Sequence, residues 1–388
     1  QKVGNQVQLI AKNTQFFAKE GTPQAQFVAE SFSDSLMSSA AVVSAPNPET
    51  KSILIEANAL LFSDIPGYQT RLEASVRMPF SLDMRNTAFT STKNTGGLTG
   101  LEVKAHFAVP KLSPPPMMPS PVPTPPPPSV TPDPRSLFVS FYYSFMPLPE
   151  PMETRVADER VGFFTVTRTD YTTDLNVKAK THFLKRWRLE KKDASAALSE
   201  PKEPIVYWLD KNIPEKYRES VMQGILEWNK AFERAGFKNA IVAKQQQVTD
   251  DFNSMDARHA SVRWFTGADV GFAIGPSQAD PRTGEILDAD IGMSDGFTRS
   301  ARRLVIEDLA RLRGADGELC EHAAEAAQEL HYALDLLEAR GVELDSPQAE
   351  ALAKAYLKDV IMHEVGHTLG LRHNFRASTV YDLKQIQD

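Results

Sequence analysis

Apolar and polar residues alternate at every second position in several segments of the first half of the chain. The pattern is clearest at residues 101–109 and 137–145, where every odd-numbered residue is apolar or aromatic. This period of two is typical of a strand with one buried face. Residues 52–62 and 162–167 are further candidate strands. The first half of the chain is therefore predicted to be rich in β-structure.

A proline-rich segment separates two of these strands. Residues 110–135 contain 13 of the 27 prolines in the sequence. Proline donates no backbone hydrogen bond and favours the extended polyproline II conformation, so the segment cannot belong to a sheet. It is interpreted as a solvent-exposed loop, in preference to a ligand for the aromatic groove of a partner.

In the second half of the chain, predicted strands alternate with predicted helices. A strand at 205–209 precedes a helix at 215–235, which Gly236 ends. After a turn at 280–284, a further strand places Leu287, Ala289, Ile291 and Met293 on one face. Shorter strands are expected at 240–243, 261–265 and 270–274, and helices at 300–312, 318–340 and 348–371. Ser346 or Asp345 can cap the last helix, and Pro347 suits its first turn.

The end of the last predicted helix carries the pattern H-E-x-x-H-x-x-G-x-x-H over residues 363–373. His363 and His367 are four residues apart, so they share one helix face and can bind one metal ion. Glu364 can reach a water activated by that metal without being a ligand itself. Gly370 can adopt the left-handed conformation that ends a helix, and the turn can return His373 as a third ligand. Three protein ligands with an open fourth position are typical of a catalytic zinc. The competing interpretation, an amphipathic helix with ordinary polar histidines, explains the complete pattern less well.

This extended motif resembles that of the metzincins, which are zinc-dependent endopeptidases. Residues 204–210 and 214–237 resemble the first strand and first long helix of a metzincin catalytic domain. Residues 280–291 look like the segment that leads into its edge strand. Together with residues 158–164, these segments are similar to a group of large secreted bacterial metzincins with a β-rich domain of unknown function ahead of the peptidase. Metzincins also have a methionine turn after the third histidine. Since no Met follows Met362, the methionine turn is expected to lie beyond Asp388.

The resemblance implies an α+β fold with two domains. Residues 1–195 would form the β-rich N-terminal domain, and residues 196–388 a metzincin-like zinc peptidase domain with a mixed sheet and an active-site helix. Zinc bound by His363, His367 and His373 would be the cofactor, with Glu364 as the general base. A protein or peptide substrate would lie along the strand that contains Leu287, Ala289 and Ile291. The expected location is extracellular, periplasmic or on the outer surface of a bacterium.

Two other functional classes stay open at this point. A zinc hydrolase of a non-peptide amide or ester would also use the H-E-x-x-H pattern, although the third histidine and Gly370 favour a peptidase. A binding protein with a relic zinc site is the second alternative, and the intact Glu364 argues against it.

Composition narrows the range of partners. The net charge is −7 and no long basic run occurs, so nucleic acid is not expected as a partner. No apolar stretch is long enough for a transmembrane helix.

The sequence begins with Gln1 and shows no signal-peptide pattern, which suits a processed product. Cys320 is the single cysteine, so no intrachain disulfide is expected. The oligomeric state is left open.

Four weaker candidate sites are interpreted as structural or left open. Cys320 and Asp158 are each considered as a group that blocks the zinc; a helix cysteine is favoured for the first, and no spacing supports the second. An acidic group of four residues is considered as a calcium site, but an exposed acidic strand and turn is favoured. The basic and aromatic run 185–188 is taken as a strand or linker. The acidic group comprises Asp280, Asp288, Asp290 and Asp295.

Overall fold

The computed structural model describes residues 1–112, 130–175, 178–266, 273–295, 321–343, 346–374, 379–382 and 384–385. The chain forms two compact units. The first contains Gln1–Pro149 and Thr169–Ala179, and the second contains Glu150–Arg168 and Lys180–Asp388. Most of the proline-rich segment, the predicted helix at 300–312 and Cys320 lie outside the described residues. The domain boundary near residue 195 stays a prediction.

The centre of the first unit is an antiparallel sheet around one long strand. Strand β7 (Leu98–Ala108) pairs with β6 (Ala88–Thr95) and β5 (Ser81–Leu82), and also with β8 (Ser136–Phe145). Alternate residues of β7 are buried, including Val103, Ala105 and Phe107. The strands predicted at 101–109 and 137–145 are therefore confirmed.

The remaining elements of the first unit are short. Strands β1 (Lys2–Val3), β2 (Gln6–Ala11) and β4 (Ser35–Ala41) form a second antiparallel sheet, and β3 (Phe16–Phe17) pairs with the end of β9 (Thr165–Asp170). The helices are α1 (Pro23–Ser31), α2 (Ala57–Leu61), α3 (Tyr68–Val76) and the 3₁₀ turn η1 (Met84–Asn86). The strand predicted at 52–62 is wrong, because α2 occupies its second half. Adjacent Leu60 and Leu61 are both buried there, which a strand with one buried face does not allow.

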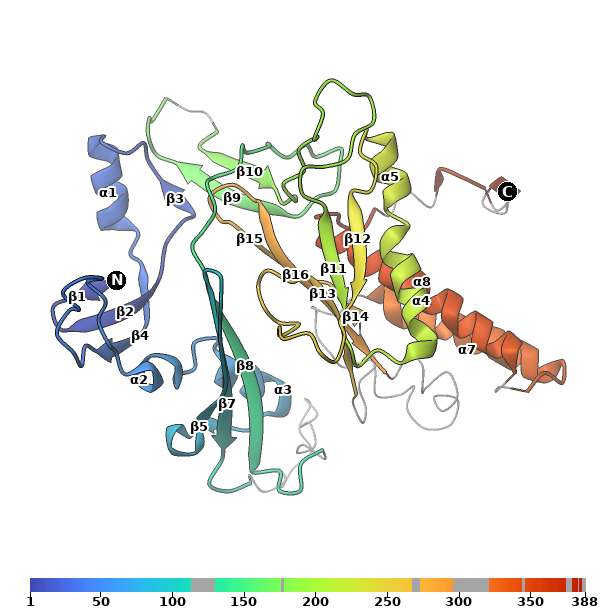
Figure 1. Ribbon diagram of the computed structural model, residues 1–388, viewed down its shortest axis with the longest axis horizontal. Helices are drawn as coiled ribbons and strands as arrows, with labels where there is room; N and C mark the ends of the chain where they lie inside the picture. The colour runs from blue at the N-terminus through green and yellow to red at the C-terminus, as the bar shows by residue number, and fades with distance from the viewer. Residues whose placement is uncertain are drawn as a thin grey trace, which may run out of the picture. The chain divides into compact units, whose positions relative to one another are not determined.

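A mixed sheet forms the core of the second unit (Figure 1). Strands β12 (Ile241–Gln245), β11 (Ile205–Leu209), β13 (Ser261–Phe265) and β16 (Ile286–Ser294) run parallel in that order. Strands β14 (Ala273–Ile274) and β15 (Ser277–Ala279) pair antiparallel with β16. Strand β10 (Lys180–Leu184) lies beside β9. The α+β fold with a mixed sheet is confirmed.

The order of the strands corrects one expectation. The strand containing Leu287, Ala289 and Ile291 was expected at the edge of the sheet, but β16 pairs with β13 on one side and with β14 and β15 on the other. The edge position belongs instead to β14 and β15. An alternating sequence predicts which face of a strand is buried, but it does not predict which strands flank it.

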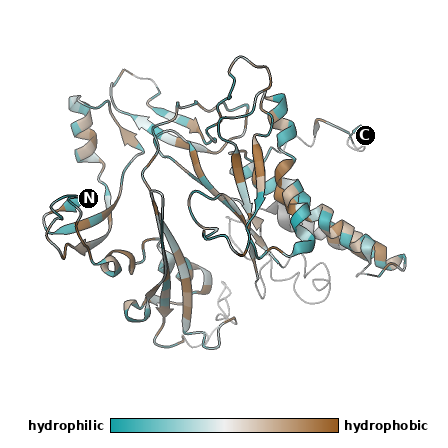
Figure 2. Ribbon diagram, viewed as in Figure 1, coloured by the Kyte–Doolittle hydropathy of each residue, from teal (hydrophilic) through white to brown (hydrophobic). Residues whose placement is uncertain are grey.

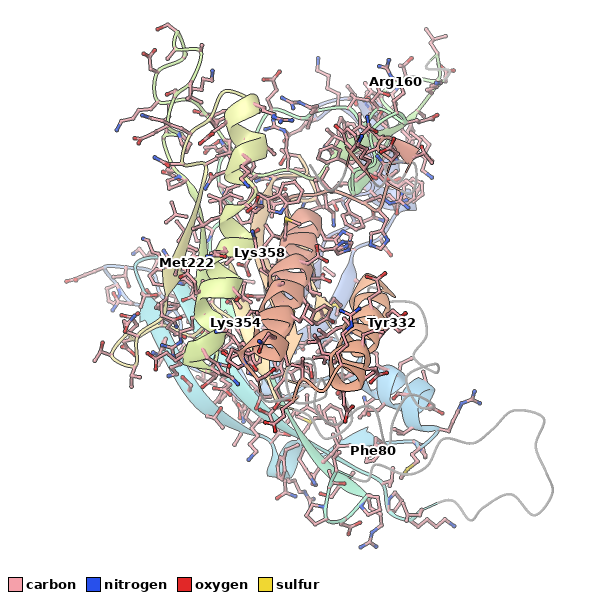
Figure 3. The ribbon with its side chains drawn as sticks, turned by 90° about the vertical axis from the view of Figure 1, so that its right-hand side faces the viewer. Phe80, Arg160, Met222, Tyr332, Lys354 and Lys358 are labelled. Carbon is pink, nitrogen blue, oxygen red and sulfur yellow. The ribbon has the colours of Figure 1, made fainter. Side chains whose placement is uncertain are left out.

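Helices α4 (Glu215–Leu226) and α8 (Pro347–Thr368) pack against each other, as Figure 3 shows with Met222 on α4 and Lys354 and Lys358 on α8. Gly224 permits the close approach, because a Cβ there would lie 2.7 Å from the Lys358 carbonyl oxygen. The helix predicted at 215–235 is divided into α4 and α5 (Asn229–Arg234). Helix α7 (Glu321–Ala339) packs on α8. Among the described residues, no helix is both long enough and apolar enough to cross a membrane.

Helix α8 is buried along two sides. Leu357, Val360, Ile361 and Val365 join the apolar residues of the sheet, which Figure 2 shows as hydrophobic stretches along the strands. Near the start of α8, Ala349 contacts Leu330 and Leu334 of α7. Ser346 caps the helix by accepting a hydrogen bond from the Ala349 amide. The helix is thus a rigid support for the residues at its C-terminal end.

Candidate metal centre

The structure brings three histidines together at the end of α8. His363 and His367 lie in the last turns of the helix, and His373 follows the turn after it. The Nε2 atom of His373 lies 3.0 Å from Nε2 of His363 and 3.1 Å from Nε2 of His367. His363 and His367 are half-buried and His373 is exposed. A search of the described residues for clustered His, Cys, Asp and Glu side chains that could hold a metal ion finds these three histidines.

The geometry and chemistry of this group fit zinc. With Zn–N bonds of about 2.0–2.1 Å, tetrahedral ligand nitrogens lie roughly 3.3 Å apart. The observed separations of 3.0 and 3.1 Å are close to that value. Three imidazoles are nitrogen donors of the kind that zinc prefers. They leave a fourth position for substrate or water.

A backbone carbonyl fixes the orientation of one of these rings. His367 Nδ1 donates a hydrogen bond to the Leu371 carbonyl oxygen at 2.8 Å. Since the ring proton is then on Nδ1, Nε2 carries the lone pair that a metal requires. The edge of the Phe164 ring also contacts His367, with ring centroids 5.9 Å apart. The hydrogen bond to Leu371 thus fixes the His367 ring from outside the metal site.

Gly370 makes the turn between the second and third histidines. Its φ of +102° lies in the left-handed region, as the sequence predicted. A Cβ at this position would lie 2.2 Å from the Lys185 carbonyl oxygen. Glycine is therefore required here both by the backbone conformation and by the close approach of the Lys185 backbone.

Three aromatic residues donate hydrogen bonds to the last two turns of α8. Trp187 Nε1 donates to the Thr368 carbonyl oxygen at 2.9 Å, and Trp228 Nε1 donates to the Met362 carbonyl oxygen at 2.8 Å. The Thr368 hydroxyl donates to the Val365 carbonyl, so the Tyr207 hydroxyl, at 2.7 Å, is the donor to Thr368 Oγ1. Burial raises the pKa of Tyr207 and keeps it a donor. None of these three aromatics was predicted from the sequence as part of the site.

Glu364 is fully buried next to the histidines, at 0% exposure. The chain between β14 and β15 lies directly against it. A Cβ on Gly275 would lie 2.7 Å from the Glu364 carbonyl oxygen and 3.2 Å from its carboxylate Oε2. Gly275 therefore allows the edge of the sheet to approach Glu364. This residue is also absent from the sequence-based prediction, because only the packed structure reveals the approach.

Two of the three residues predicted to contact substrate are buried. Ala289 and Ile291 are 1% and 0% exposed and belong to the core between the sheet and the helices. Leu287 is half-buried and does not belong to this core. Of the four residues predicted to share a face of this strand, Ala289, Ile291 and Met293 belong to one core, and Leu287 does not.

The acidic residues do not form the exposed surface that the sequence suggested. Asp280, Asp288 and Asp295 are at most 3% exposed. Asp280 accepts hydrogen bonds from the Arg282 guanidinium. Asp158, considered as a blocking group, is bound by the Arg160 guanidinium, which lowers the pKa of its carboxyl group. Neither Asp280 nor Asp158 belongs to the metal-binding group.

Two carboxyl groups on β16, one buried and one half-buried, have raised pKa values. Burial, assisted by the charge of Asp290, raises the pKa of Asp288 to about 8, and burial raises that of Asp290 to about 6. Asp256 adds to the effect on Asp288, while Ser261 donates to Asp290 and Arg263 lies near it. In the folded state the Asp288 carboxyl group therefore keeps its proton up to about pH 8, whereas in the unfolded chain it loses the proton near pH 4.

Asp288→Asn is expected to stabilise the protein at pH 8 by about 1–3 kcal/mol. A raised pKa favours the folded state at low pH, and this advantage is lost as the pH rises from about 4 to 8. The gain over the natural protein should therefore shrink toward zero near pH 4. Urea unfolding at both pH values measures the difference. A variant that is less stable at pH 8 would contradict the assignment.

Two family models match the chain. Residues 1–192 match the family described as Domain of unknown function (DUF5117), and residues 345–388 match the family described as Met-zincin. No curated protein and no solved structure matches the chain. The second match covers most of helix α8 and all three histidines of the metal centre. The segment that carries the three histidines is thus a Met-zincin domain, and it follows a DUF5117 domain in the same chain.

Proposed function

We propose that this protein is a zinc-dependent endopeptidase. The observation that carries the proposal is the convergence of His363, His367 and His373 beside the buried carboxylate of Glu364. The Met-zincin match supports a zinc peptidase. Three nitrogen ligands suit a catalytic zinc better than a structural one, which usually has four protein ligands.

Zinc at this position would supply a Lewis acid that lowers the pKa of water and polarises a carbonyl group. Glu364 accepts the proton of the attacking water and then delivers it to the leaving nitrogen. Its place on the rigid helix α8, directly after His363, keeps the carboxylate near the reacting atoms. The hydrogen bond from His367 to the Leu371 carbonyl keeps that ring in its ligating orientation.

We further propose that the substrate adds to the edge formed by β14 and β15. Among the described residues, no strand pairs with the outer side of these two strands. Gly275, between them, lies against Glu364. An extended peptide that pairs with this edge by main-chain hydrogen bonds would pass beside the general base. This edge replaces β16 as the proposed substrate-binding strand.

The zinc hydrolase of a non-peptide amide or ester is the alternative function. Digestion of a peptide library and of an acyl-ester panel by the zinc-loaded full-length protein separates the two. Peptide cleavage at internal positions supports the endopeptidase. Ester or amide hydrolysis without peptide cleavage would replace it with the alternative.

The metal itself provides an independent test. We expect one zinc per chain in the purified, zinc-loaded protein and a loss of at least tenfold in zinc affinity in His367→Ala, because one of three ligands is removed. Elemental analysis and competition with a chelator measure both quantities. His182→Ala, which alters an exposed histidine outside the group, is the matched control. Equal zinc content in His367→Ala and His182→Ala would refute the site.

A further inference from the structure

A short extended segment from the N-terminal half of the sequence borders the third ligand. Phe163 forms an antiparallel bridge with Leu371. The Phe164 amide donates to the Gly370 carbonyl at 2.7 Å, and the Arg372 amide donates to the Gly162 carbonyl at 3.0 Å. Residues 162–164 are called the strap below. The strap therefore pairs with the three residues that precede His373.

The strap is itself held on its other side. The Lys185 amide donates to the Phe164 carbonyl at 2.8 Å. Two residues further on, Trp187 donates to Thr368 at the end of α8. Arg188 is anchored by a two-point hydrogen bond to the buried carboxylate of Glu285, at 2.6 and 2.5 Å. Residues 185–188 thus connect the strap to both the sheet and the metal-bearing helix.

Both segments belong to the same compact unit as the histidines, although they fall within the DUF5117 match. We propose that the strap is a positioning element of the metal centre, so that part of the DUF5117 segment is needed for tight metal binding. The inference rests on the proposed function in taking zinc as the metal. It assigns a role to residues that the Met-zincin match does not include.

The hydrogen bonds show how the strap acts on two ligands at once. The hydrogen bonds donated by the Phe164 and Arg372 amides fix the backbone on either side of Leu371. The Leu371 carbonyl then accepts the hydrogen bond from His367 Nδ1, and the chain continues directly to His373. Without the strap, the backbone at Leu371 would be less fixed, so the His367 ring would be less well oriented and His373 less well positioned. Partners of this kind typically change metal affinity by about 10- to 100-fold when they are removed.

The test compares two substitutions at one strap residue in the full-length protein. Phe164→Pro removes the amide that donates to Gly370, whereas Phe164→Ala keeps that amide and removes only the ring that contacts His367. We expect Phe164→Pro to weaken zinc binding about 10- to 100-fold. We expect Phe164→Ala to stay within about threefold of the natural protein, since side-chain packing at 5.9 Å contributes less than the backbone pairing.

Zinc affinity is measured by competition with a chelator, and the ligand geometry by the visible absorption of the cobalt-substituted protein. Phe164→Pro should shift this absorption away from the four-coordinate form, and Phe164→Ala should keep the absorption of the natural protein. Natural affinity and an unchanged spectrum in Phe164→Pro would overturn the inference. His367→Ala is the reference: if it retains zinc, the proposed metal centre itself fails, whatever the strap does.

A second measurement covers the case in which Phe164→Pro does not fold. Amide hydrogen exchange in the natural protein, with and without zinc, reports on the Phe164 and Arg372 amides directly. The inference requires that both become more protected when zinc binds, because the pairing and the ligand turn stabilise each other. Protection of the Phe164 amide that zinc leaves unchanged would show that the strap is independent of the site.

Discussion

Glu364→Gln is expected to lower the rate of peptide cleavage by about 10²- to 10⁴-fold while zinc stays bound. Glutamine has nearly the same shape as glutamate but cannot accept the proton of the attacking water. The three histidine ligands are untouched, so the metal and the fold should be retained. Cleavage of an unfolded protein substrate by the full-length protein gives the rate, and elemental analysis of the same sample gives the zinc content.

The control for this variant is Glu350→Gln. Glu350 lies in the first turn of the same helix, where it forms an ion pair with Lys354 far from the histidines. This substitution removes an equal charge from α8 and should leave activity close to that of the natural protein. Near-normal cleavage by Glu364→Gln would remove Glu364 from the mechanism. A loss of zinc together with activity would instead assign Glu364 a structural role.

Gly370→Ala is expected to destabilise the protein by at least about 2 kcal/mol and to weaken zinc binding at least tenfold. The added methyl group would lie 2.2 Å from the Lys185 carbonyl oxygen, and the backbone has a φ of +102°. The chain must therefore move away from Lys185, and the turn that returns His373 moves with it. Thermal unfolding of the metal-free protein and chelator competition measure the two effects separately.

Gly341→Ala separates the two causes. Gly341 also has a positive φ, of +78°, but nothing lies within 4 Å of a Cβ at that position. Its substitution should lower the free energy of unfolding only through the unfavourable backbone conformation, by roughly 1 kcal/mol. Zinc affinity should be unchanged. If both variants lose the same stability and neither loses zinc, the close contact with Lys185 does not position the third histidine.

The sequence predicted those parts of the structure that depend on local patterns. The period-two segments at 101–109 and 137–145 became β7 and β8, and the capped helix at the C-terminal side became α8 with its boundaries shifted by a few residues. The histidine spacing predicted that His363, His367 and His373 come together, and the structure confirms it. Each of these features is encoded within a few turns or residues of chain.

The errors arose where the outcome depends on distant partners. The acidic residues of β16 indicated an exposed face, yet Asp288 is 3% exposed, and the charge of the distant residue Asp256 contributes to its raised pKa. Similarly, the edge position of β14 and β15 depends on pairing order, which alternation does not encode. The strap lies in the segment 158–164 that contributed to the resemblance, but it acts through backbone amides and carbonyls, so its sequence did not predict its pairing with residues 370–372.

The pairing of Phe163 with Leu371 also affects how the protein is made. The two partners are far apart in sequence, and a contact of that kind forms late because a long loop must close first. During synthesis on the ribosome, the strap emerges well before the histidines that it supports. The metal centre can be completed only when the chain has been made past His373. A fragment that starts after residue 192, where the first family match ends, would contain every ligand and yet lack the strap that pairs with the residues before the third one.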